Sequence, residues 1–114
     1  MLFPIIKEFK PDLILISAGF DSAAGDKIGR VEVSPVGYAW MTQGLRMIQP
    51  KIGAVLEGGY CLSSLQVSSE AVIRTLLSKP DDQKAHQEIL KLFGAPPELD
   101  SFDKLTKEAL VKPR

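Results

Sequence analysis

The 114-residue sequence has few of the features that mark several large classes of protein. It has one cysteine, so no disulfide can form within the chain, and no apolar run approaches the roughly 18 residues of a membrane span. Basic and acidic residues number 14 each, so the net charge is zero and gives no basis for direct contact with nucleic acid or membrane. With 45% hydrophobic residues, the sequence predicts a folded, soluble, intracellular domain or part of one.

Two common kinds of catalytic motif are also missing. The sequence has neither a glycine-rich phosphate-binding loop nor the G-x-S-x-G motif of serine hydrolases. Its single histidine, His86, lies in a charged segment with Lys84 and Glu88, so we interpret it as a solvated surface residue. Cys61 has no identifiable histidine partner, which favours a packing role over that of a reactive thiol.

The composition changes near Lys79 and Pro80. Half of the charged residues lie in the last 36 positions, whereas 8 of the 9 glycines come earlier in the chain. We therefore predict a domain segment at residues 1–79 that carries any chemistry. Residues 80–114 are predicted to form a charged helical extension, with helices at 83–93 and at about 98–110.

Helical and strand-like patterns alternate along residues 1–79. The predicted order is a helix at 2–9, a strand at 12–18, a loop at 19–33, a helix from 35 to about 49, a strand at 52–57 and a helix at 62–77. The continuous apolar run from Leu13 to Ile16 suits a strand buried on both faces of a parallel sheet. The alternation is typical of βαβ units, so the predicted fold class is α/β, a parallel sheet with flanking helices.

The spacing of large apolar residues predicts which side of each long helix is buried. In the two longer helices, the residues at helical spacing are Tyr38, Met41, Leu45 and Ile48, and then Leu65, Val72, Ile73, Leu76 and Leu77. Trp40 and the three methionines also fit helix faces, and we expect them in the core.

Two polar residues follow the predicted strands. Ligands bind beyond the carboxyl ends of parallel strands, and Asp21 and Tyr60 occupy those places, the latter in Glu57-Gly58-Gly59-Tyr60. A carboxylate there can ligate a metal or act as a base, and a phenol beside two glycines can donate a hydrogen bond to a substrate carbonyl. Asp21 can equally form a local turn and Tyr60 can be a half-buried aromatic, so position alone leaves both interpretations open.

Three segments, in order, resemble the C-terminal part of a class II histone deacetylase catalytic domain. They are SAGFDSAAGD at 17–26, VSPVGYA at 33–39 and LEGGY at 56–60. The resemblance covers about residues 4–79, and the LEGGY form favours class II over class I. It implies the arginase/deacetylase α/β fold and zinc-dependent hydrolysis of acetyl-lysine amides in histones or other proteins.

The resemblance also implies roles for individual residues. Asp21 matches a zinc-binding aspartate of the family, and Tyr60 matches the tyrosine that hydrogen-bonds the substrate carbonyl. Gly58 and Gly59 would leave room for the extended acyl-lysine. Lys27 and Cys61 stand where class II members commonly have proline and asparagine, which changes the expected rim of the substrate channel.

Other parts of the family's active site have no counterpart before Asp21. The family's Asp-x-His zinc ligands and its tandem histidines precede this segment, so we expect a partial catalytic domain, inactive alone, whose partner is the missing N-terminal part. Two alternatives stay open, an acetylpolyamine deacetylase of the same fold and a truncated, non-catalytic interaction module. Class II members occur in cytoplasm and nucleus, so either or both locations are expected.

Overall fold

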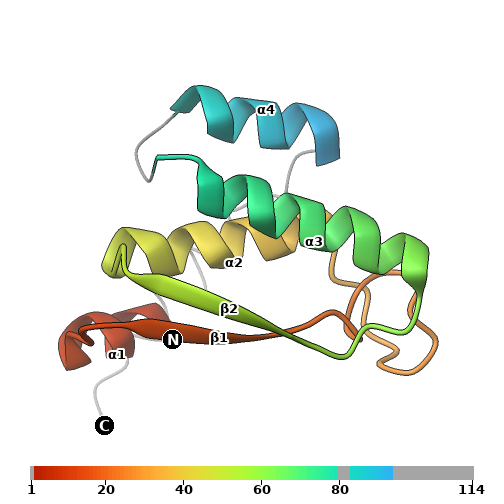
Figure 1. The fold of residues 1–114 in the computed structure, drawn as a ribbon, viewed down its shortest axis with the longest axis horizontal. Helices are drawn as coiled ribbons and strands as arrows, with labels where there is room; N and C mark the ends of the chain where they lie inside the picture. Colours follow the sequence, from red (N-terminus) through yellow and green to blue (C-terminus); the bar gives the residue numbers. More distant parts are fainter. Residues whose placement is uncertain (1, 80–82, 94–114) are drawn as a thin grey trace, which may run out of the picture.

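The computed structural model describes residues 2–79 and 83–93 (Figure 1). The elements are α1 (Leu2–Phe9), β1 (Ile14–Gly19), α2 (Pro35–Ile48), β2 (Ile52–Glu57), α3 (Leu62–Leu77) and α4 (Gln83–Phe93). This order confirms the alternation expected from the sequence, although β1 begins and ends slightly later than predicted. The helix predicted at about 98–110 lies outside the described residues. None of the described helices is long and apolar enough to cross a membrane.

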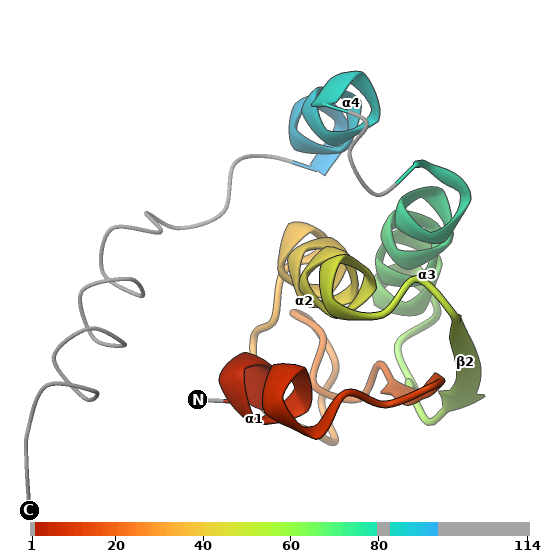
Figure 2. The ribbon, with the colours of Figure 1, turned by 90° about the vertical axis from the view of Figure 1, so that its left-hand side faces the viewer.

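The two strands form a parallel pair. Ile14 pairs with Ile52 and Gly19 with Glu57, so both strands end at the same edge. Figure 2 shows α2 and α3 next to each other on one side of this sheet, with α4 beyond them. The structure therefore confirms the predicted α/β class, a small parallel sheet with flanking helices, and it brings the loops that follow β1 and β2 together.

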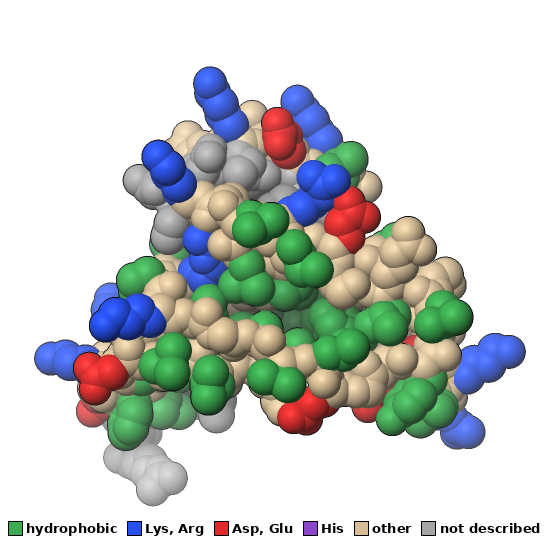
Figure 3. Space-filling view, viewed as in Figure 1, with side chains coloured by type: hydrophobic (Ala, Val, Ile, Leu, Met, Phe, Trp, Pro, Cys, Tyr) green, Lys and Arg blue, Asp and Glu red, His purple; other side chains and the backbone are tan. Residues whose placement is uncertain are grey.

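One face of the sheet differs from the sequence-based expectation. Leu15 is 72% exposed, and Leu13 and Val55 on the same face are also exposed. Residues of β1 that alternate with them, such as Ile16 and Ala18, are partly buried, and Ala18 packs against the core. The prediction of a strand buried on both faces is thus wrong for the described residues, because α2 and α3 lie on one side of the sheet only (Figure 2). Even on that side, Leu56, which pairs with Ala18, is 61% exposed. Figure 3 shows hydrophobic side chains gathered over this part of the molecule.

The two long helices pack through small and polar side chains. The buried residues are Val36, Tyr38, Ala39, Thr42 and Arg46 on α2, and Ser64, Ser68, Ala71, Val72 and Thr75 on α3. Small residues let the helices approach closely, and several large apolar residues lie outside the contact. The predicted apolar faces are therefore wrong at four exposed positions, Met41, Met47, Ile73 and Leu77. Trp40 is partly buried, and Met1 lies outside the described residues.

Hydrogen bonds to the C-terminal end of α3 stabilise the buried charge of Arg46. Its guanidinium donates hydrogen bonds to the carbonyl oxygens of Thr75 and Ser78, and one to the Ser78 hydroxyl at 3.2 Å. Carbonyls at the end of a helix have no partner within that helix, so a cation from a neighbouring helix stabilises them. Arg46 thereby joins α2 to α3.

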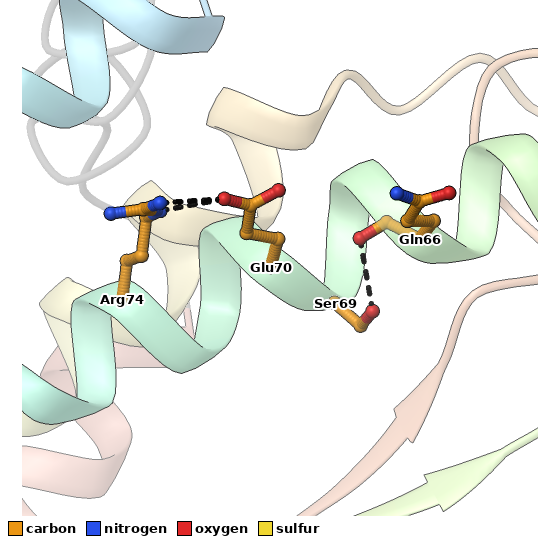
Figure 4. A network of polar contacts seen from close by, with 4 residues as sticks. All are labelled: Gln66, Ser69, Glu70 and Arg74. Atoms are coloured by element: carbon orange, nitrogen blue, oxygen red, sulfur yellow. Dashed lines mark hydrogen bonds and ion pairs between the residues drawn. The ribbon is translucent and has the colours of Figure 1, made fainter.

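The outer side of α3 is polar (Figure 4). Arg74 Nε donates a 2.8 Å hydrogen bond to Glu70 Oε1, one helical turn earlier, and the Ser69 hydroxyl donates to the Gln66 carbonyl at 3.1 Å. The Arg74–Glu70 pair is exposed, so it contributes only about 0.3–0.5 kcal/mol. This polar surface contrasts with the exposed apolar face of the sheet.

Candidate functional site

The loop after β1 is held in place by buried side chains and backbone hydrogen bonds. Phe20 is 4% exposed, and its ring centroid lies 5.0 Å from that of Tyr38 on α2. Ala23 is completely buried and forms a bridge with Val33, in which the Val33 N–H donates to the Ser22 carbonyl at 3.0 Å. The loop therefore folds back on itself and packs against the helices, so residues within it have fixed positions.

Asp21 lies between two anchored residues of this loop. Phe20 is in the core, and the Ser22 hydroxyl shares a 2.7 Å hydrogen bond with the Tyr38 hydroxyl. Gly29 packs directly against the Asp21 backbone, since a methyl group on Gly29 would lie 2.0 Å from the Asp21 carbonyl oxygen. The Asp21 carboxylate is only partly buried, and no hydrogen bond to it is found within the described residues. Its oxygens are therefore available to a ligand.

Two glycines turn the chain sharply after β2. Gly58 and Gly59 have φ angles of +69° and +104°, a region that favours glycine. A methyl group on Gly59 would lie 2.9 Å from the Phe20 Cβ and 3.1 Å from the Leu65 Cδ1. The structure thus gives Gly59 a packing role, because only glycine lets this loop close onto the core. Its substrate-binding role stays a prediction.

Gly58 lies close to both Asp21 and Tyr60, the two side chains that the sequence predicts as site residues. A methyl group on Gly58 would lie 3.7 Å from the Asp21 Cγ and 3.7 Å from the Tyr60 hydroxyl oxygen. Tyr60 is 64% exposed, so its hydroxyl can reach a ligand. The carboxylate and the phenol therefore face one accessible place at the carboxyl ends of both strands, to the right in Figure 1.

Asp26 is a buried carboxylate to which the sequence analysis assigned no role. It is 5% exposed, and its Oδ2 accepts hydrogen bonds from the N–H groups of Tyr60 at 2.7 Å and Cys61 at 3.1 Å. Its Oδ1 accepts from the N–H groups of Ile28 at 2.8 Å and Gly29 at 3.4 Å. These bonds, first that from Tyr60 and then that from Ile28, lower the pKa of Asp26 although burial raises it. Asp26 is thus held as an anion.

Cys61 is the N-cap residue immediately before α3, and it is partly exposed. Its Sγ lies 3.3 Å from the Ser63 hydroxyl, and hydrogen bonds from Ser63 and then Ser64 lower the pKa of the thiol to about 7. An ordinary cysteine has a pKa of about 8.5. The predicted packing role is therefore only part of its description, since these hydrogen bonds favour the thiolate form.

The described residues fit one ligand of a zinc site rather than a complete one. Among them, no group of three or more His, Cys, Asp and Glu residues could hold a metal ion. A catalytic zinc takes three protein ligands, and Asp21 offers one carboxylate that no hydrogen bond within the described residues occupies. His86 falls in α4, but its side chain is outside the described part of the chain, so its predicted surface position is untested.

Comparison with known proteins identifies the segment. A family model described as "Histone deacetylase domain" matches residues 1–76. "Histone deacetylase HDA1" of Candida albicans is 48% identical over 80 residues, which cover 69% of this chain and 10% of that protein. "Polyamine deacetylase HDAC10" of Mus musculus is 47% identical over 81 residues, which cover 70% of this chain and 12% of that protein.

A solved structure agrees with these relatives. The HD domain of HDA15 superposes with a TM-score of 0.67 at 42% identity, over 80% of this chain and 26% of that one. The fold and the site thus define a segment of an α/β deacetylase catalytic domain. The chain belongs to the histone deacetylase family, which confirms the predicted resemblance to its class II members. It spans about a tenth of the length of the curated relatives.

Proposed function

We propose that residues 1–79 form the C-terminal part of a zinc-dependent deacetylase domain that hydrolyses acetyl-lysine amides in histones or other proteins. The names of the relatives support a deacetylase. The observation that carries the proposal is that the Asp21 carboxylate carbon and the Tyr60 hydroxyl oxygen both lie 3.7 Å from the position that a methyl group on Gly58 would take. Residues 80–114 are proposed as an extension to this domain, and the cytoplasm or nucleus as its location.

In this proposal Asp21 supplies one zinc ligand, and the remaining ligands come from the rest of the domain. Zinc, when bound, would polarise the amide carbonyl and lower the pKa of water. Asp21 suits this role because Phe20, Ser22 and Gly29 fix its backbone while its carboxylate oxygens stay available. A ligand that is fixed in advance costs little reorganisation when the metal binds.

Tyr60 is proposed as the hydrogen-bond donor to the substrate. Its hydroxyl would donate to the acetyl carbonyl oxygen and stabilise the negative charge that develops there as water adds to the carbonyl carbon. Gly58 carries no side chain near Tyr60 and Asp21, so the acetyl group can approach both. Gly59 supports this arrangement by letting the loop close onto Phe20, which holds the Tyr60 backbone near β1.

A polyamine substrate is the second candidate, and one observation favours it. Polyamine deacetylase HDAC10 of Mus musculus is nearly as similar to this chain as the histone deacetylase of Candida albicans is. Both substrates present an acetylated amine to the same carboxylate and phenol, so the two reactions differ only in recognition outside the described site.

A chimera tests the proposal. Residues 1–76 would replace the matching segment of the Candida albicans relative, which supplies the rest of the domain. We expect zinc-dependent turnover of an acetyl-lysine peptide that Tyr60→Phe lowers on the order of a hundredfold, with zinc content unchanged. Glu32→Gln is the control, because Glu32 is exposed in the loop after β1 and is not among the residues that hold Asp21 or Tyr60.

Three results would count against parts of the proposal. Near-normal turnover of the Tyr60→Phe chimera would reject Tyr60 as the donor. Faster turnover of acetylspermidine than of the peptide would favour the polyamine substrate. A folded chimera that is inactive on both substrates would favour the non-catalytic interaction module.

A further inference from the structure

The Asp26 carboxylate joins two loops that are far apart in the sequence. Its Oδ1 accepts hydrogen bonds from Ile28 and Gly29 in the loop after β1. Its Oδ2 accepts hydrogen bonds from Tyr60 and Cys61, which connect β2 to α3. One buried side chain thus satisfies four backbone N–H groups, two from each loop.

The first of these loops reaches Asp21 through Gly29. The Gly29 backbone packs against the Asp21 carbonyl so closely that a methyl group on Gly29 would lie 2.0 Å from the oxygen. Asp26 binds the Gly29 N–H from one side and the Tyr60 N–H from the other. The chain of contacts therefore runs from the Asp21 backbone, through Gly29 and Asp26, to the Tyr60 backbone.

The Tyr60 side chain has little packing of its own. It is 64% exposed, and the two residues before it are glycines, which restrict the backbone less than other residues do. Its direction therefore depends on its backbone, where the 2.7 Å bond to Asp26 is made. At Cys61, the next residue, Asp26 supplies an acceptor for the N–H group immediately before α3.

We propose that Asp26 is a positioning residue, which sets the Tyr60 hydroxyl relative to the Asp21 carboxylate. This inference rests on the proposed function, because it explains how the two groups keep the spacing that the reaction uses. Asp26 touches neither the substrate nor the metal in this account, and it acts through the backbone of Tyr60.

The chemistry of the side chain makes the proposal specific. A carboxylate has two acceptor oxygens and can face two pairs of N–H donors, as Asp26 does. An amide has one acceptor oxygen and a donating NH₂ group, so Asp26→Asn would turn a donor toward one pair of N–H groups. The substitution keeps the size of the side chain and breaks the link between the loops.

Two control variants separate the positioning of Tyr60 from the loss of a carboxylate and from loosening of the two loops. Glu32→Gln makes the same chemical change at an exposed carboxylate of the same loop. Ser64→Ala removes the 2.7 Å hydrogen bond from the Ser64 hydroxyl to the Ala24 carbonyl, which also joins α3 to this loop, and it leaves the Asp26 bonds intact. Ser64→Ala therefore reports what simple loosening of the two loops does.

The first experiment measures amide hydrogen exchange in the whole 114-residue chain. We expect Asp26→Asn to speed exchange at Tyr60 and Cys61, whereas Glu32→Gln leaves both amides unchanged. Unchanged exchange at both amides in Asp26→Asn would overturn the proposal, because the link would not hold the loop. This readout involves no activity, so it stands apart from the proposed function.

The second experiment measures kinetics in the chimera. We expect Asp26→Asn to lower kcat about tenfold to a hundredfold, as small misplacements of catalytic groups do, with little change in KM and zinc content. In a Tyr60→Phe background the same substitution should have almost no further effect on kcat. Independent, multiplicative effects of the two substitutions would overturn positioning through Tyr60.

Two further outcomes would overturn the kinetic role of Asp26. Should Ser64→Ala lower kcat as much as Asp26→Asn at an equal loss of Tm, general loosening would explain the effect and the proposal would fail. Should Tyr60→Phe alone leave kcat normal while Asp26→Asn speeds amide exchange, the proposed function fails at Tyr60 and the kinetic role of Asp26 fails with it, whereas the link between the loops stands.

Discussion

Two regions of this molecule differ in how far their apolar side chains are buried. In the closed region, which comprises the loop at 20–34 with α2 and α3, Phe20 and Val72 are buried around Tyr38. On the open sheet face, which comprises Leu13, Leu15 and Val55, the side chains are exposed. The contrast shows that the closed region has a core around Tyr38, although Ile28 and Met47 within it are exposed, whereas the open sheet face has no cover among the described residues.

The exposed sheet face agrees with the short length of the chain relative to the proteins that it resembles. It spans 26% of the HDA15 domain to which it is structurally similar. We propose that the rest of a deacetylase domain covers the open sheet face and extends the sheet. The closed region, by contrast, contains the contacts that position Asp21, Tyr60 and Asp26, so the local geometry of these residues is defined within this segment.

The largest effect should come from a cavity in the closed region. Phe20→Ala would remove a buried ring that packs on Tyr38, and we expect a loss of about 3–5 kcal/mol in the free energy of unfolding. Leu15→Ala on the open sheet face, where the side chain is 72% exposed, should change it by about 0.5 kcal/mol or less. Urea unfolding of the 114-residue chain measures both. Equal losses for the two variants would contradict the division into two regions.

Glycine substitutions sharpen the same division at the backbone. A methyl group on Gly29 would meet the Asp21 backbone at 2.0 Å, so Gly29→Ala should cost about 3 kcal/mol. Gly53→Ala is the matched control, since its methyl group would meet only the end of the exposed Leu15 side chain, at 3.1 Å. Thermal unfolding would show a large decrease in Tm for the first variant and a small one for the second. A tolerated Gly29→Ala would contradict the close packing around Asp21.

The open sheet face should also control association. An exposed apolar face and an unpaired strand edge both favour contact with another chain. We therefore expect the 114-residue protein to be oligomeric or poorly soluble. Leu15→Lys with Val55→Lys should shift it toward monomer in size-exclusion chromatography. Ile28→Lys with Met47→Lys changes two apolar residues that are equally exposed but lie off the sheet, and it should leave the oligomer intact. The reverse result would place association elsewhere.

A smaller effect concerns acid pH in the closed region. Because hydrogen bonds lower the pKa of Asp26 from its ordinary 3.8, its ionised form stabilises the fold fully above that value, and this stabilisation is lost as the pH falls through the lower folded pKa. The stability difference between the wild type and Asp26→Asn should therefore shrink from about pH 7 to about pH 3. Urea unfolding at both values, with Glu32→Gln as a control, measures it. A difference independent of pH would contradict the bonds to Asp26.

The order of elements was predictable because each has strong local signals. Ser34 and Pro35 mark the start of α2, and the Ser34 hydroxyl accepts a hydrogen bond from the Gly37 N–H at 3.2 Å, as such a cap should. The buried faces of the helices were predictable only in part from large apolar residues, since Tyr38 and Val72 are buried but Met41 and Leu77 are exposed. The α2–α3 contact uses Ala39, Thr42 and Ala71, and small residues carry a weak periodic signal.

The site was predictable only where its residues have a local sequence signal. Asp21 and Tyr60 follow strands directly, so the rule that ligands bind at strand ends finds them. Asp26 lies within a loop, and its sequence signal is local, since an aspartate often accepts a hydrogen bond from the N–H two residues later. Its bond to Tyr60, 34 positions away, depends on how the two loops pack and has no local signature.

The most direct test of the central claim is the zinc content of the chimera after dialysis. We expect one zinc per domain in the parent and in Asp12→Ala, a control that removes an exposed carboxylate just before β1. Asp21→Ala should lose tightly bound zinc, because it removes one of three protein ligands and a negative charge. Full zinc stoichiometry in the Asp21→Ala domain would contradict the account.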